Sequence, residues 1–265
     1  MKLDIWFMRH GESEMNKSPH IIQGRSEHVK LSEKGFVQAE KLGERLLKEG
    51  VKFDAVYSSP LIRAYDTARI ACERLGIPKE TIVRLEGLVE QSHGDWEGKL
   101  RDEVYTPEVR KQLQKDAYNF YPPNGESMKM VEERMYSFVR LYLFPLQSLL
   151  FETEIVKKAE KVLEHKLMQK TKLGRFIAET YDFAKNQVMN TQKENSTIAV
   201  FSHAMAIKCL ARKIMGFSPE MAYRFRMSNT GISRLEYTEK GWFPVSLNDA
   251  GHLVGMEQAE FTPLA

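Results

Sequence analysis

The chain has 265 residues, of which 42% are hydrophobic and 28% are charged, the composition of a folded globular protein rather than a disordered chain. Its formal net charge of +3 is small and its basic and acidic residues are interspersed, so we expect neither a nucleic-acid nor a membrane partner. No apolar run is long enough to cross a bilayer and no secretion signal is recognisable, which favours a cytoplasmic enzyme. Cys72 and Cys209 lie among apolar neighbours, so we interpret them as buried thiols.

Short apolar runs and helical patterns alternate along the chain. A buried-strand pattern at residues 3–8 precedes a helix that runs from the N-cap residue Ser32 to about Gly50. A second strand at 53–57 leads to Ser59-Pro60, which we expect to cap the next helix and form its first turn. The later elements are expected to be strands at 82–85 and 197–201, a helix at about 204–215, and a hairpin of strands 232–237 and 242–247.

This alternation predicts a three-layer α/β/α sandwich with a mostly parallel central sheet, folded as a single domain over 1–265. One stretch interrupts the pattern: from about Phe138 to Gln192 no strand is indicated, and apolar residues recur at helical spacing. We therefore expect a helical insertion at about 145–192. A hairpin packed on the edge of the domain is the plain interpretation. A lid over the site or a dimerisation arm is the alternative, and the sequence does not decide between them.

Four side chains with useful chemistry are expected at one edge of the sheet. His10 follows the first strand and His203 follows the fourth, while Arg63 comes soon after the second and Glu90 after the third. Ligands bind open α/β sheets in the crevice beyond the carboxyl ends of the strands, so this topology would gather the four residues in one place. A single histidine after a strand is usually a surface residue. Four residues of suitable chemistry at the equivalent ends of four strands favour a functional site.

The residue types suit the transfer of a phosphoryl group. A neutral imidazole such as that of His10 attacks phosphorus directly and divides a difficult displacement into two easier steps. Arg9 and Arg63 offer guanidinium donors that match phosphate oxygens, and His203 and Asn16 would add further donors.

Proton transfer is assigned to Glu90, which would protonate the leaving alkoxide and later take a proton from water. Gly11 would let the backbone turn tightly beside His10. This chemistry requires neither a metal nor another cofactor, and the remaining histidines lack metal-ligand spacing.

With these residues in view, the chain resembles the histidine phosphatase superfamily, the phosphoglycerate mutase-like proteins. The blocks that carry the resemblance are Arg9-His10-Gly11-Glu12-Ser13 with Asn16, Gly24-Arg25, Leu31-Ser32-Glu33-Lys34-Gly35, Ser58-Ser59-Pro60-Leu61-Ile62-Arg63-Ala64, Glu90 with Gly94-Asp95-Trp96-Glu97-Gly98, Gly125-Glu126-Ser127 and Ser202-His203. The resemblance implies the fold of that family, with His10 as the nucleophile and Glu90 as the proton donor. It also implies a substrate-binding set made up of Arg9, Asn16, Arg63, His203 and Gly24.

The resembled family contains hydrolases and cofactor-dependent phosphoglycerate mutases. A mutase must hold a small polyanion, and mutases of the family typically carry an arginine-tyrosine pair after the acid/base glutamate and a paired arginine further on. Here Gln91-Ser92-His93 follows Glu90, and Tyr118-Asn119-Phe120-Tyr121 holds no paired arginines. We therefore expect hydrolysis of a small phosphorylated substrate. A mutase, or a protein that binds a phospho-ligand without turnover, is the alternative, and a homodimer is left open.

Overall fold

A computed structural model describes residues 2–143 and 195–256 of the chain. The expected helical insertion at about 145–192 lies outside the described residues. Within the two described stretches, no helix combines the length and the apolar character that a membrane span needs.

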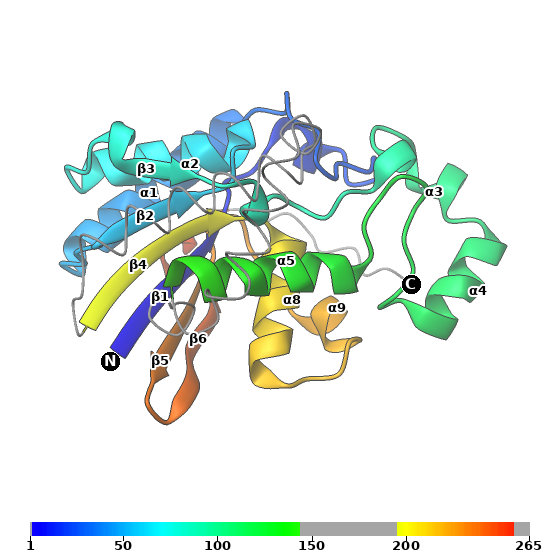
Figure 1. The fold of residues 1–265 in the computed structure, drawn as a ribbon. Helices are drawn as coiled ribbons and strands as arrows, with labels where there is room; N and C mark the ends of the chain where they lie inside the picture. The colour runs from blue at the N-terminus through cyan, green and yellow to red at the C-terminus, as the bar shows by residue number, and fades with distance from the viewer. Residues whose placement is uncertain (1, 144–194, 257–265) are drawn as a thin grey trace, which may run out of the picture.

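One six-stranded sheet forms the centre of the molecule, with the order β3-β2-β4-β1-β5-β6 (Figure 1). Strand β4 pairs in parallel with β1 and β2, and β2 pairs in parallel with β3. The last two strands are antiparallel and complete one edge as the expected hairpin. The strands are β1 (Lys2–Arg9), β2 (Ala55–Ser58), β3 (Ile82–Arg84), β4 (Asn195–Ser202), β5 (Ile232–Thr238) and β6 (Gly241–Asp249). This arrangement confirms the predicted α/β sandwich.

Helices cover both faces of this sheet. In Figure 1, α1 and α2 lie on one side of the strands, α5 and α8 lie on the other, and α4 extends away from the sheet. The described α-helices are α1 (Glu33–Lys48), α2 (Ile62–Arg74), α3 (Arg101–Val104), α4 (Pro107–Asp116), α5 (Met128–Phe138), α8 (Ala204–Met215) and α9 (Met221–Arg224). The short helical turns are η1 (Glu14–Lys17), η2 (Lys79–Thr81), η3 (Glu86–Leu88), η4 (Gly94–Trp96), the π-helical η5 (Val139–Leu143) and η7 (Gly251–Leu253).

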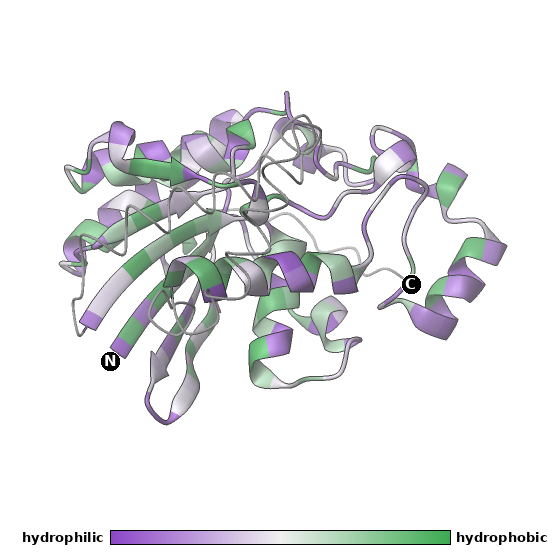
Figure 2. Ribbon diagram, in the orientation of Figure 1, coloured by the Kyte–Doolittle hydropathy of each residue, from purple (hydrophilic) through white to green (hydrophobic). Residues whose placement is uncertain are grey.

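The core has two halves, one on each face of the sheet. Along β1, Ile5 and Phe7 join the cluster that contains residues of α5 and α8, whereas Trp6 and Met8 join the cluster that contains residues of α1 and α2. Side chains alternate between the faces of a strand, so the part of a strand that is covered on both sides is apolar on both, which explains the consecutive apolar residues Ile5–Met8. Figure 2 shows this hydrophobic character along the central strands.

The start of α2 differs from the prediction. The helix begins at Ile62, and its N-cap residue is Leu61, which makes no side-chain capping bond. Ser59 does not cap the helix. Its hydroxyl instead lies 2.8 Å from Nε2 of His203 and accepts a bond from the amide of Leu61. The hydroxyl of Ser59 therefore contacts the histidine that follows β4 and does not cap the helix. The expectation that Ser59-Pro60 forms the first turn of α2 was wrong by two residues.

Candidate active site

His10 is held at the end of β1 as a neutral imidazole. Its backbone amide donates to the carbonyl of Ser202, at the end of β4, over 3.0 Å. Its Nδ1 lies 2.6 Å from the carbonyl oxygen of Gly11. A carbonyl accepts only, so Nδ1 carries the proton and Nε2 keeps a free electron pair. Burial, followed by the charges of Arg63 and Arg9, holds the pKa of His10 well below its ordinary value, so that this pair is available at neutral pH.

His203 lies beside the nucleophile, at the end of β4. The two imidazole centroids are 5.1 Å apart, and the rings are tilted by 57°. Both side chains are closed off from solvent, with His10 3% exposed and His203 fully buried. Burial, Arg63 and His10 hold the pKa of His203 well below its ordinary value, so the ring is neutral in the unliganded protein. A bound phosphoryl dianion would favour its protonated, donating form.

The two predicted arginines come from different elements, because Arg9 ends strand β1 and Arg63 lies in the first turn of helix α2. Arg63 donates through its two terminal nitrogens to the carbonyls of Ser26 and Gly24, each over 2.8 Å, and Arg9 donates to the carbonyl of Met227. Both guanidinium Nε groups, like Nδ1 of His203, are buried without a hydrogen-bond partner among the described residues. Burial also lowers the pKa of Arg63, to about 10. Unpaired buried donors are costly, so this cluster is suited to an anion that can accept from them.

Glu90 approaches the cluster from the loop after η3. Its carboxylate accepts from the backbone amides of Met205 over 3.2 Å and Ala206 over 3.1 Å. These amides belong to the first turn of α8, whose donors have no partner within the helix and whose dipole favours a negative charge. The charge of Glu90 also acts on Arg9 and Arg63. The acid/base candidate is therefore held next to the predicted phosphate cations.

Asn16 and Gly24 contact the protein rather than an exposed pocket. The side-chain oxygen of Asn16 accepts from the amide of Ser13 over 3.0 Å, and its nitrogen donates to Gln23 over 3.2 Å. Gly24 has a φ of +50°, and a Cβ there would lie 2.3 Å from Oε1 of Glu97, so glycine is required. Its carbonyl accepts from Arg63. Direct substrate binding by these two residues stays a prediction.

Three residues that the sequence analysis did not assign to the site support the two histidines and the loop after His10. Asn229 donates to the carbonyl of His10 over 3.1 Å and lies 3.4 Å from Oδ1 of Asn16. Thr67 accepts from the amide of Gly11 over 2.9 Å, and Ser59 contacts His203 as described above. Asn229 comes just before β5, the strand that pairs with β1. This position before a strand was the signal in the sequence that could have placed Asn229 near His10.

Gly11 has a different role from the one expected. It is not among the residues with a positive φ, so the loop does not need its freedom to turn. A Cβ at Gly11 would lie 2.5 Å from the carbonyl oxygen of Gly35, and a Cβ at Gly35 would lie 2.0 Å from that of Glu12. The loop after His10 thus packs backbone to backbone against the start of α1, which leaves no space for a side chain at either position.

A cleft of about 370 Å³ lies beside this cluster. Its walls include Leu61 and Ile62, which precede Arg63, and Val89, which precedes Glu90. The two histidines do not line it, so the cleft adjoins the buried cluster without reaching the nucleophile in this structure. Its complete lining is Arg25, Glu27, His28, Pro60, Leu61, Ile62, Glu86 and Val89.

Similar proteins fall into two groups. Phosphoglycerate mutase from Schizosaccharomyces pombe is 36% identical over 157 residues, which is 58% of this chain and 69% of that protein. A 2,3-bisphosphoglycerate-dependent phosphoglycerate mutase from Parvibaculum lavamentivorans is 34% identical over 140 residues, 52% of this chain and 66% of that protein. Among solved structures, a phosphoserine phosphatase variant from Entamoeba histolytica shares the fold with a TM-score of 0.64 at 23% identity, covering 95% of this chain and 99% of the other. A mycobacterial glucosyl-3-phosphoglycerate phosphatase shares the fold with a TM-score of 0.64 at 21% identity, and the match covers 94% of this chain and 99% of the other.

The family assignment rests on most of the chain. The model of the histidine phosphatase superfamily (branch 1) matches residues 5–143 and 164–250. Both histidines, both arginines and Glu90 fall inside the matched stretches, and the described structure brings them to one end of the sheet. The chain therefore belongs to the histidine phosphatase superfamily.

Proposed function

We propose that this protein is a phosphatase that hydrolyses small phosphomonoesters through a phosphohistidine at His10, without a metal. The observation that carries the proposal is the state of the nucleophile. Its imidazole is neutral, its Nδ1 proton is held by the carbonyl of Gly11, and the buried Nε groups of Arg9 and Arg63 and Nδ1 of His203 have no hydrogen-bond partner among the described residues. Such an arrangement supplies a nucleophile together with groups that accept the charge of a phosphoryl group.

The proposed reaction has two displacements. Nε2 of His10 attacks phosphorus and forms the P–N bond as the P–O bond to the alcohol breaks, and Glu90, in its acid form, gives its proton to the leaving oxygen. Water then attacks the phosphohistidine while Glu90 takes up a proton from it. The P–N bond breaks, inorganic phosphate leaves, and His10 and Glu90 return to their starting states.

Mutase activity is the second candidate, because the curated relatives named above are mutases. A mutase must retain a small polyanion and so needs cations that are free to bind it. Arg25 and Arg134 contact the main chain of Glu90, but both are already paired with Glu126. The segment Gln91-Ser92-His93 adds no arginine or tyrosine. These features favour water as the acceptor of the phosphoryl group.

The test is phosphate release from a panel of phosphomonoesters in EDTA, with isomerisation of 3-phosphoglycerate in the presence of 2,3-bisphosphoglycerate measured alongside. We expect release by the wild type and none by His10→Ala. A control variant, His20→Ala, changes an exposed histidine and should keep the wild-type rate. Circular dichroism verifies that each variant folds. Isomerisation faster than hydrolysis would establish a mutase. Activity that survives in His10→Ala would refute the phosphohistidine, and silence in both assays would favour a binding role.

A further inference from the structure

The main-chain carbonyl of Glu90 accepts from two arginines at once. Arg25 donates to it through Nε over 2.9 Å, and Arg134 donates through Nη2 over 3.0 Å. The other end of the residue, its carboxylate, is held by amides of the first turn of α8. Glu90 is therefore fixed at both its backbone and its side chain. Both arginines hold its backbone, while its carboxylate is held by main-chain amides, so the arginines act on where the residue sits.

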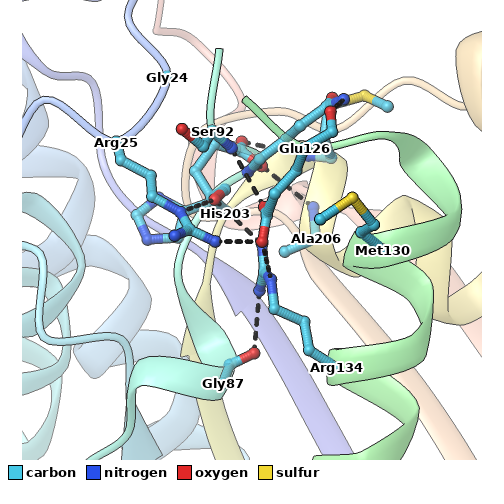
Figure 3. A network of polar contacts seen from close by, with 12 residues as sticks. Gly24, Arg25, Gly87, Ser92, Glu126, Met130, Arg134, His203 and Ala206 are labelled. Atoms are coloured by element: carbon cyan, nitrogen blue, oxygen red, sulfur yellow. Dashed lines mark hydrogen bonds and ion pairs between the residues drawn. The ribbon is translucent and has the colours of Figure 1, made fainter. Parts of the chain in front are cut away.

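Glu126 joins the two arginines into one cluster. Figure 3 shows Arg25 and Arg134 converging on its carboxylate, at 2.5 Å and 3.1 Å. The amide of Ser92 donates to the same carboxylate over 3.2 Å. Burial alone would raise the pKa of Glu126, but Arg134 and Arg25 lower it, so the residue is ionised and the pairs are charge-assisted.

Arg134 also connects this cluster to the hydrophobic core. Its Nη1 donates to the carbonyl of Gly87, in the turn η3 that leads to Glu90, over 3.0 Å. It projects from α5, whose neighbouring residues Val131, Met135 and Phe138 are fully buried against the sheet. A guanidinium offers several donors in one plane, so the single side chain of Arg134 binds Gly87, Glu90 and Glu126 together. The ammonium group of a lysine is a compact point charge and matches such a set of acceptors less well.

We propose that Arg134 is a positioning residue for proton transfer: it holds the Glu90 loop against α5 so that the carboxyl group stays in reach of the leaving oxygen. This inference rests on the proposed phosphatase function and adds to it. A purely structural clamp would affect every substrate alike. A positioning residue affects the step that needs the acid, because an acid displaced by about 1 Å loses much of its effect, up to about 100-fold.

Leaving groups distinguish these two roles. An alkyl phosphate needs its oxygen protonated as it departs, whereas 2,4-dinitrophenyl phosphate leaves without help from an acid. For Arg134→Met we expect kcat/KM on the alkyl ester, which reports formation of the phosphohistidine, to fall by about 10- to 100-fold, with a loss of kcat/KM of less than about threefold on the dinitrophenyl ester. Glu90→Gln should show the same selectivity, and the double variant should add little to it. Arg134→Lys should recover part of the lost rate.

The control is Arg74→Met, which removes an arginine whose side chain is 46% exposed on α2 and should match the wild type on both esters. Glu126→Gln provides a second way to loosen the cluster if Arg134→Met does not fold, and it should give the same selectivity in a milder form. Equal losses on the two esters in the folded variants, or no loss on either, would overturn the positioning role. A wild type that releases phosphate from neither ester would instead refute the proposed function itself.

Discussion

The chemistry of the site depends on two histidines that the fold keeps neutral. Burial is the largest cause of the lowered pKa of both His10 and His203, and the charge of Arg63 acts in the same direction. For the nucleophile this is an advantage, because a protonated imidazole has no electron pair to offer. For the stability of the protein it creates a dependence on pH, because the unfolded chain has no such environment.

Stability should therefore fall as the solution becomes acidic. Below about pH 6.5 the unfolded chain takes up a proton on each of these histidines and the folded protein does not, so the free energy of unfolding drops by as much as about 1.4 kcal/mol per pH unit for each. The loss of stability continues down to the pKa of each histidine in the folded protein. Above about pH 7.5 both histidines are neutral in the folded and unfolded chain, so they no longer contribute to the pH dependence of stability. Urea unfolding at about pH 7.5 and 5.5 measures it. In His203→Gln the drop should be smaller than in the wild type, whereas exposed His20→Gln should show the full drop. Equal drops in wild type and His203→Gln would contradict this account.

The sequence was sufficient to find the residues that follow strands. His10, Arg63, Glu90 and His203 could be predicted together because the carboxyl ends of parallel strands meet at one edge, whatever their distance in sequence. The supporting residues could not be predicted in this way. Arg134 lies in the middle of a helix and reaches Glu90 through a long side chain, so its partners depend on how α5 packs and not on any local pattern.

At the scale of elements, capping serines define where several helices begin. Ser32 accepts from the amide of Gly35, and Ser127 accepts from the amide of Met130. The first of these was predicted from the pattern that follows it. The start of α2 was not, because the sequence signal of Ser59-Pro60 is the same whether the serine caps a helix or contacts a histidine from another strand. Local propensity decides an element boundary only where tertiary contacts do not compete for the same side chain.

The cap of α5 offers a test at this scale, because Ser127 and Ser137 lie at opposite ends of the same helix. Ser127 is 4% exposed and accepts from the amide of Met130 over 3.2 Å. Ser127→Ala should lower the free energy of unfolding by about 1 kcal/mol, since one amide of the first turn loses its acceptor. Ser137 is partly exposed, and its hydroxyl donates back to the carbonyl of Glu133. Ser137→Ala should leave stability unchanged or raise it slightly, because alanine is the better helix former. Denaturant unfolding compares the two, and equal losses would show that Ser127 does not act as a cap.

At the scale of the whole molecule, the fold brings positive charge and unpaired donors to one buried place. The α/β/α layers and the hairpin edge were predictable from alternating patterns, but the strand order was not, since β4 pairs with β1 across most of the chain. That pairing is what places His203 beside His10. The unliganded protein therefore carries the free-energy cost of removing Arg9 and Arg63 from water close to each other. Burial lowers the pKa of both guanidinium groups.

Folding and phosphate binding should accordingly be linked. An anion that accepts from these donors binds the folded chain and not the unfolded one, so inorganic phosphate should raise the midpoint of thermal unfolding, with a gain of about 2.7 kcal/mol at about 100 times its Kd. Scanning fluorimetry measures the midpoint, and potassium chloride at equal ionic strength controls for screening of surface charges. Arg63→Met unfolds at a lower temperature because Gly24 and Ser26 lose their donor, so the quantity compared is the shift caused by phosphate, which should shrink. Arg74→Met should keep the full shift. A full shift in Arg63→Met, or one reproduced by chloride, would show that phosphate stabilises the protein at some other place.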